Sequence, residues 1–204
     1  IYEIPEEKFE SFIEEKKSAV NEAVGELTTA GILAFAKGRP HVSNNSGENE
    51  WYTPPEIIES ARLVMGSIDL DPATSLIANK IVMASRIYTV IDNGLNQKWD
   101  GNVWMNPPYS QPLITQFSSK LVEQLPNIKQ ACVLVNNATD TAWLQTMINR
   151  SDMVCFLKSR VKFIDVNGNA SGAPLQGQVI IYFGFNPILF KDEFKKYGIC
   201  MMRA

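Results

Sequence analysis

The spacing of apolar residues changes near position 50 of this 204-residue chain. Within residues 1–36, apolar side chains such as Phe9 and Phe12 recur at helical intervals, which predicts an N-terminal helical segment. Residues 37–49 are polar and contain Gly and Pro, so they predict a linker. From residue 50 to 204, short apolar runs alternate with amphipathic stretches. That alternation predicts one α/β domain, because strands that alternate with helices form layered sheets.

The elements expected within this domain follow from the same periodicities. Helices are expected at residues 54–65, 112–125, 141–150 and 190–197. Strands are expected at 67–70, 86–90, 101–105, 131–135 and 153–157, and the wholly apolar run at 131–135 is typical of a central parallel strand. Residues 161–164 and 178–183 flank a loop rich in Gly, Ser and Pro, and predict a C-terminal antiparallel hairpin.

The most informative stretch is Asn106-Pro107-Pro108-Tyr109, directly after the buried strand expected at 101–105. Two consecutive prolines have no backbone donors and end a strand at once. The Asn side-chain oxygen and the proline carbonyls remain as hydrogen-bond acceptors, beside an aromatic ring. These groups suit a planar exocyclic amine. The alternative is an ordinary turn, since Asn and Pro are common turn formers.

This tetrapeptide resembles the (D/N/S)PP(Y/F) motif of amino methyltransferases that use S-adenosylmethionine. Together with four further stretches, the tetrapeptide resembles the phage-type DNA N6-adenine methyltransferases, the Dam-like group. The four stretches are Trp51-Tyr52-Thr53-Pro54, Asp69-Leu70-Asp71-Pro72-Ala73-Thr74, Asp92-Asn93-Gly94-Leu95 with Trp99, and Pro174-Leu175-Gln176-Gly177-Gln178. The resemblance covers residues 47–184. It implies a Rossmann-like class I methyltransferase sheet, here preceded by the helical segment and completed by the C-terminal hairpin.

The resemblance makes Asn106, Pro107, Pro108 and Tyr109 the catalytic residues. The Asn106 side-chain oxygen and the Pro107 carbonyl would accept the hydrogens of the adenine amine, and Tyr109 would stack on the base.

The resemblance also implies a site for S-adenosylmethionine, with Asp71 nearest the amino-acid end of the cofactor. The implied contacts are Trp51, Tyr52, Thr53, Pro54, Asp69, Asp71, Pro72, Ala73, Asp92 and Asn106. Alternatives exist for several of them: Thr53 and Asp71 are natural helix N-caps, and Asp92-Asn93-Gly94 is a standard turn sequence. The loop after Asp71 has small residues where related enzymes are glycine-rich.

The net charge of −3 argues mildly against a protein that coats nucleic acid without sequence preference, but it is compatible with a local basic groove. Arg160 and Lys162 alternate with Val161 and Phe163, so both charges are expected on one face of a strand. We expect Arg160 and Lys162 to contact DNA phosphates, and Gln176 or Gln178 to reach base edges. A solvated surface is the alternative for the charged pair.

Several other chemistries are disfavoured. The three cysteines lie in apolar surroundings and predict buried free thiols, as in the cytoplasm of a bacterial or phage-infected cell. None lies beside a Pro in a plausible catalytic loop, which argues against methylation of a cytosine carbon. No Cys/His metal spacing is present, so no metal is expected, and one histidine excludes most His-based schemes. No apolar run reaches the roughly 18–20 residues that cross a membrane.

The sequence therefore predicts S-adenosylmethionine-dependent methylation of the adenine N6 amine in DNA. Methylation of a protein glutamine or an RNA base through the same pocket is the alternative enzyme. Two further alternatives are a non-catalytic module that binds nucleic acid and a protein that dimerises through its N-terminal helices.

Overall fold

The computed structural model describes residues 52–164 and 176–202. The chain divides between Ser46 and Gly47 into two units, and the described residues all belong to the second. The helical segment expected at 1–36, the linker at 37–49, and residues Trp51, Pro174 and Leu175 lie outside the described residues. Predictions that concern them, including the domain boundaries, stay predictions.

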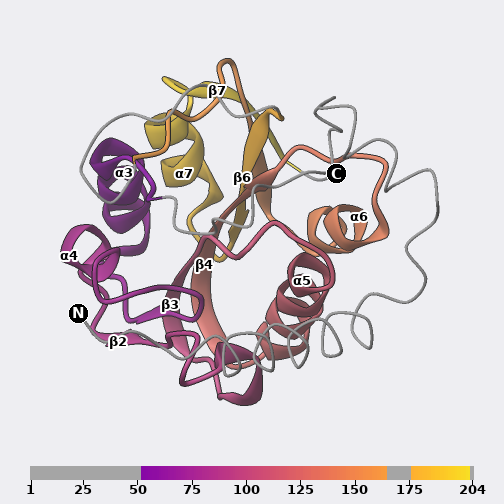
Figure 1. Ribbon diagram of the computed structural model, residues 1–204. Coiled ribbons are helices and arrows are strands. Elements are labelled where there is room, and N and C mark those ends of the chain that lie inside the picture. Colours follow the sequence, from indigo (N-terminus) through magenta and orange to yellow (C-terminus); the bar gives the residue numbers. More distant parts are fainter. Residues whose placement is uncertain (1–51, 165–175, 203–204) are drawn as a thin grey trace, which may run out of the picture. The chain divides into compact units, whose positions relative to one another are not determined.

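The described residues form a seven-stranded sheet in the order β2-β1-β3-β4-β6-β5-β7 (Figure 1). In chain order its strands are β1 (Leu70–Asp71), β2 (Arg86–Ile87), β3 (Gly101–Met105), β4 (Ile128–Asn136), β5 (Met153–Leu157), β6 (Gln178–Phe183) and β7 (Gly198–Met202). The neighbours from β2 through β4 are parallel, whereas β6 is antiparallel to both β4 and β5, and β7 is antiparallel to β5. This arrangement confirms the expected α/β class.

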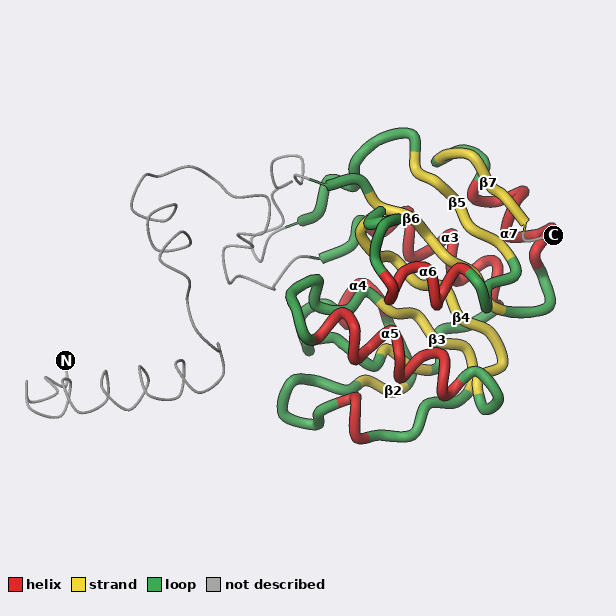
Figure 2. Tube along the Cα trace, turned by 90° about the vertical axis from the view of Figure 1, so that its right-hand side faces the viewer, coloured by secondary structure: helices red, strands yellow, loops and turns green. Residues whose placement is uncertain are grey.

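Helices cover both faces of the sheet (Figures 1 and 2). One face packs against α3 (Pro55–Met65), α4 (Asn79–Val82) and α7 (Pro187–Phe194), and the other against α5 (Leu113–Gln124) and α6 (Ala142–Ile148). Successive strand residues alternate between the two cores: Trp104 faces α3, and Val103 and Met105 face α5. Among the described residues, no helix is both long enough and apolar enough to span a bilayer.

The expected strands at 101–105, 153–157 and 178–183 are confirmed at the same bounds. The last helix begins earlier than expected, because Pro187 suits the first turn of a helix. The edge strand β7 was not expected at all. Residues 199–202 are a short, unbroken apolar run, which periodicity alone does not assign to a strand or a helix, and in the structure Ile199, Met201 and Met202 are exposed.

The predicted hairpin between residues 161–164 and 178–183 is wrong. Strand β6 lies between β4 and β5, and Ile164 instead forms an isolated bridge with Tyr52. The physical reason is the burial of β6, whose Val179, Ile180 and Ile181 are fully inaccessible to solvent. A strand that is apolar on both faces needs a partner on each side, and residues 161–164 bury only Val161 and Phe163.

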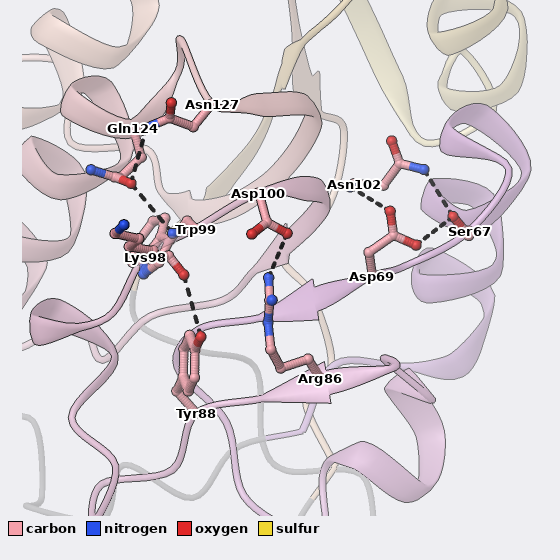
Figure 3. A network of polar contacts seen from close by, with 10 residues as sticks. All are labelled: Ser67, Asp69, Arg86, Tyr88, Lys98, Trp99, Asp100, Asn102, Gln124 and Asn127. Atoms are coloured by element: carbon pink, nitrogen blue, oxygen red, sulfur yellow. Dashed lines mark hydrogen bonds and ion pairs between the residues drawn. The ribbon is translucent and has the colours of Figure 1, made fainter.

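Buried polar groups tie β1, β3 and β4 together at the end of the sheet where these strands begin. The Asn102 backbone N–H donates to Asp69 Oδ2 at 2.8 Å, and Ser67 Oγ donates to the other oxygen of that carboxylate at 2.8 Å (Figure 3). Asn102 Nδ2 donates to Met65 O at 3.1 Å, and Gln130 Nε2 donates to Asn102 Oδ1 at 3.3 Å.

Strand β3 begins with a residue that must be glycine. Gly101 has φ +72°, and a Cβ there would lie 2.6 Å from Asp69 Oδ2. Any other side chain would therefore displace the Asp69 carboxylate from the Asn102 N–H. Nearby, Arg86 of β2 pairs with Asp100 at 2.7 Å across the exposed edge (Figure 3).

Replacing Asn102 by Ala should destabilise the fold. Asn102 is 3% exposed, and its loss removes one acceptor of the Gln130 amide and one of two donors to the Met65 carbonyl, which keeps its 3.2 Å hydrogen bond from Gln130. Each buried group left unsatisfied costs about 1–3 kcal/mol. Urea unfolding should show a lower midpoint at unchanged slope, and Asn127→Ala, at an exposed position, should change stability by less than about 0.5 kcal/mol. Equal midpoints for the two variants would contradict this assignment.

Candidate active site

Three polar residues follow neighbouring parallel strands at their carboxyl ends. Asp71 ends β1, Asn106 follows β3, and Asn136 ends β4. Because β1, β3 and β4 are adjacent and parallel, the three residues lie along one edge of the sheet. This is the edge at which open α/β sheets bind ligands.

The Asn106 side chain is engaged at both ends of its amide. Its Nδ2 donates to Thr53 Oγ1 at 3.2 Å, and the Tyr109 hydroxyl donates to its Oδ1 at 2.8 Å. The amide oxygen is thereby directed toward Tyr109, away from Thr53. The residue that sequence motifs identify as the amine acceptor is thus held by two hydroxyl groups from separate segments of the chain.

Tyr109 is partly buried, and it packs against the apolar cores on both faces of the sheet. Its hydroxyl also lies 3.4 Å from the Leu134 carbonyl, and its ring meets the Phe163 ring edge-on at 6.3 Å between centroids. Burial raises the pKa of the Tyr109 phenol, so this hydroxyl keeps its proton and remains a donor at neutral pH.

Thr53 does not cap the helix that follows it, so that alternative for Thr53 is wrong. Helix α3 begins at Pro55, with Pro54 at the cap position and no side-chain cap. Thr53 is 6% exposed, and its hydroxyl faces Asn106 instead. The adjacent Tyr52 exchanges two backbone hydrogen bonds of 2.9 Å with Ile164, which fixes this loop against the segment after β5.

Asp71 is a buried carboxyl without a compensating cation. It is 3% exposed, and its Oδ1 accepts a hydrogen bond from the Ala73 N–H at 3.2 Å. Desolvation raises the pKa of Asp71 to about 7, against the smaller opposing effect of that N–H. None of the ion pairs among the described residues includes Asp71.

Thr74, in the same loop, supplies a second buried polar group that can accept or donate further hydrogen bonds. Its hydroxyl is buried and has no hydrogen-bond partner of regular geometry among the described residues, although it is close enough to the Asp71 carboxyl to lower its pKa. A buried carboxyl and a buried hydroxyl with spare capacity suit a polar, positively charged ligand group.

The loop of residues 72–74 is held in place by the Asp92-Asn93-Gly94 turn and Trp99. A Cβ on Gly94 would lie 2.0 Å from the Pro72 carbonyl oxygen, so only glycine permits this approach. Trp99 is fully buried and donates from Nε1 to the Gly94 carbonyl at 2.8 Å. The motif around Trp99 therefore positions the loop that follows Asp71.

Two residues that were predicted to contact the cofactor, Asp69 and Asp92, make other contacts in the structure. Asp69 precedes β1 and accepts from Ser67 and Asn102, so it belongs to the contacts that set strand register. Asp92 is exposed, and Thr89 donates to its Oδ2 from both N–H and hydroxyl at 2.8 Å, which lowers the pKa of Asp92. The turn alternative for Asp92 is confirmed, and its contact with a cofactor stays a prediction.

Gln178 is not available to contact DNA, so that prediction is wrong. It is 2% exposed; its Oε1 accepts from Val161 N–H at 2.9 Å, and its Nε2 donates to Gln176 O at 2.7 Å and Asn136 Oδ1 at 3.2 Å. Gln178 instead joins the ends of β4 and β6 to the segment after β5. Gln176 is partly exposed, and its predicted DNA contact remains untested.

A groove of about 450 Å³ lies between the start of α3 and residues 157–164. Arg160 and Lys162 line it and are exposed, whereas Val161 and Phe163 are buried, which confirms the expected alternation. Lys158 also lines the groove, and the ion pairs among the described residues include none of these three cations. Lys196, which also lines the groove, is paired with Glu193.

A mixed α/β sheet with an Asn-Pro-Pro-Tyr sequence after a central strand is consistent with a methyltransferase-like fold. Residues 41–188 match the family described as DNA N-6-adenine-methyltransferase (Dam), and the chain belongs to that family.

Two phage proteins of the same description are similar to this chain. The DNA N-6-adenine-methyltransferase of Escherichia phage T1 is 32% identical over 121 residues, which are 58% of this chain and 48% of that protein. The DNA N-6-adenine-methyltransferase of Haemophilus phage HP1 (strain HP1c1) is 28% identical over 127 residues, 60% of this chain and 70% of that protein. The match with this chain therefore spans about half the length of the T1 protein.

The buried Asp71 carboxyl should make the ligand-free protein less stable as the pH rises. Its pKa is about 7 in the folded protein and 3.8 as the reference value, so the folded state binds the extra proton between these values. The stability present below pH 4 is then lost as the pH rises through 7, by up to about 4 kcal/mol. Asp71→Asn removes this titration while keeping an acceptor for the Ala73 N–H. Thermal unfolding should show a melting temperature above wild type at pH 8 and close to it at pH 4. A difference between the two proteins that is independent of pH would contradict a neutral, buried Asp71.

Proposed function

We propose that this chain transfers a methyl group from S-adenosylmethionine to the N6 amine of adenine in DNA. The observation that carries this proposal is the Asn106 amide, whose oxygen is fixed at the carboxyl end of β3 by contacts with Thr53 and Tyr109. Family membership and the buried, unpaired Asp71 on the neighbouring strand support it.

The cofactor-binding residues proposed are Asp71 and the small residues that follow it. The bound cofactor would supply an electrophilic methyl group on a positively charged sulfur. The Asp71 carboxylate would pair with the cofactor's ammonium group and thereby be held in its ionised form. The Thr74 hydroxyl, buried and without a regular partner, would take a further polar contact.

Asn106 would act on the amine as it becomes a nucleophile. The lone pair of the adenine amine is delocalised into the ring, so attack requires the nitrogen to become more tetrahedral. Asn106 Oδ1 and the Pro107 carbonyl would accept the two amine hydrogens and stabilise the positive charge that develops. Because the amide is already oriented, little reorganisation is needed during the reaction.

Tyr109 would have to change partners when a base enters. In the structure its hydroxyl donates to the same Asn106 oxygen that the amine requires. Base entry would displace this hydroxyl and bring the ring into a stacking position. Extruding a base from duplex DNA costs a few kcal/mol, and stacking on an aromatic ring returns about 1–3 kcal/mol.

Duplex DNA would lie along the groove beside α3. Arg160 and Lys162 are exposed cations on one side of an extended segment, and Val161 and Phe163 between them anchor that segment in the core. Their contacts would be to phosphates and would not depend on sequence. Gln176 remains the proposed contact with a base edge. The free thiols Cys132 and Cys155 fit a reducing cytoplasm.

The decisive experiment measures methyl transfer to DNA by wild type and by Asn106→Ala. Loss of the Asn106 acceptor should slow the chemical step by about 10²–10³-fold, with cofactor affinity little changed, because the lost contact is mainly with the substrate. Tyr109→Phe is the matched control: it keeps the stacking ring and removes only the hydroxyl that must leave, so it should retain most activity. The measurement is single-turnover transfer of labelled methyl, with mass spectrometry of the product nucleoside.

The outcomes separate the proposed function from its alternatives. Formation of 6-methyladenine in DNA supports it. Label on a protein glutamine or on RNA, with none on DNA, would favour the alternative enzyme, and binding of DNA without transfer would favour a non-catalytic module. A fully active Asn106→Ala would remove Asn106 from the catalytic site. Asp71→Asn should bind S-adenosylmethionine more weakly than wild type.

Replacing Arg160 and Lys162 together by Ala should weaken DNA binding equally for all sequences. Each lost phosphate contact should reduce the slope of log affinity against log salt by about 0.9 on duplex DNA, so the double variant should lose about 1.8. Lys129→Ala with Arg150→Ala removes the same charges from exposed positions away from the groove and serves as the control. If the control reduces the slope equally, the groove is not the DNA surface.

A further inference from the structure

Thr53 is the described residue whose side chain contacts the nitrogen end of the Asn106 amide, through a 3.2 Å hydrogen bond to its Oγ1. Thr53 belongs to a different segment of the chain, lies outside the Asn-Pro-Pro-Tyr stretch and is 6% exposed. Since it does not cap α3, its hydroxyl is not needed for the start of that helix. The contact with Asn106 is therefore its main polar interaction in the structure.

The need for such a partner follows from the chemistry of an amide. The two ends of an Asn side chain have nearly the same shape, but one end donates and the other accepts hydrogen bonds. An amine substrate requires the accepting end. If the amide turned over, its NH₂ group would face the amine hydrogens, and two sets of donors would oppose each other. An aspartate at this position would have no such difficulty, because either carboxylate oxygen accepts.

We propose that Thr53 is a positioning residue: its hydroxyl holds the Asn106 amide with the oxygen directed at the substrate amine. This inference rests on the proposed function and deepens it, since it assigns to Thr53 a role in the methyl-transfer step and not in cofactor binding. Thr53 is itself held in place, because neighbouring Tyr52 is bonded through its backbone to Ile164 in both directions at 2.9 Å.

The Tyr109 hydroxyl supports the same orientation from the other side. It donates to Asn106 Oδ1 at 2.8 Å, so in the structure the amide oxygen faces Tyr109. That hydroxyl must leave when the base enters, so it cannot orient the amide during the reaction. Thr53 is on the side of the amide that the substrate does not occupy, and its contact can persist throughout.

The test is a double-mutant cycle between Thr53 and Asn106. Thr53→Val has the same shape and lacks the hydroxyl, so it should slow single-turnover methyl transfer by about tenfold or more, because small misplacements of a reacting group are costly. Thr53→Ser should restore the rate. In an Asn106→Asp background, Thr53→Val should slow transfer by less than about threefold, because the carboxylate presents an acceptor in either orientation.

Two measurements separate positioning from other roles. Thr53→Val should change the affinity for S-adenosylmethionine little. If Thr53→Val lost this affinity while the rate of methyl transfer stayed unchanged, Thr53 would be a cofactor contact instead. An equal slowing by Thr53→Val in the wild-type and Asn106→Asp backgrounds would indicate a general structural effect and overturn the proposal. Thr146→Val, which removes an exposed hydroxyl on α6, is the matched control for the substitution. If Thr53→Val does not fold, Thr53→Ala takes its place in the same cycle.

A readout that needs no activity keeps this inference distinct from the proposed function. Exchange of the Asn106 side-chain amide hydrogens, followed by nitrogen-15 NMR in the ligand-free protein, should be slow in wild type and Thr53→Ser and faster in Thr53→Val. If wild type methylates no DNA, the proposed function fails, and this exchange still reports whether Thr53 holds the amide. Exchange in wild type as fast as that of the exposed Asn127 amide would overturn the role of Thr53.

Discussion

The position of the candidate active site depends on the register of β3 between β1 and β4. Asn102 sets this register: its backbone bonds to Asp69 on the β1 side, and its side chain bonds to Gln130 of β4. A slip of one residue would turn every side chain of β3 to the opposite face. Asn106 would then face α5 and lose Thr53, which lies at the start of α3 on the other side of the sheet.

The two ends of the parallel strands thus have different roles. At the end where the strands begin, buried amides hydrogen-bond to one another and fix the geometry of the strands. At the end where they finish, Asp71 is left buried without a cation, and its raised pKa records the cost of desolvating its charged form. A protein that was shaped only for stability would not keep such a carboxyl. A buried carboxyl at this position fits the proposed pairing with a charged ligand group, at a cost in stability.

Two segments distant in sequence meet the Asn-Pro-Pro-Tyr turn that follows β3. The loop before α3 supplies Thr53, the turn after β3 supplies Tyr109, and the segment after β5 contributes Phe163 against the Tyr109 ring. That last segment also presents Arg160 and Lys162 to the adjacent groove. The cations proposed to contact DNA therefore lie on the same stretch of backbone as Phe163, which contacts the ring proposed to stack on the base, so a displacement of that stretch affects both.

Local sequence determined the α/β class, the buried strand before Asn106 and the alternation of Arg160 and Lys162 with Val161 and Phe163. Each of these depends on neighbouring residues alone: on periodicity, on proline's lack of a donor, and on the two-residue repeat of extended backbone. The roles of Thr53, Asp69 and Gln178 depended on partners far away along the chain. Thr53 looked like a cap and contacts Asn106; Gln178 looked like a DNA contact and joins β4 to β6. A side chain's hydrogen-bond partner is decided by which strands pair and in what register, and only the tertiary structure decides that pairing.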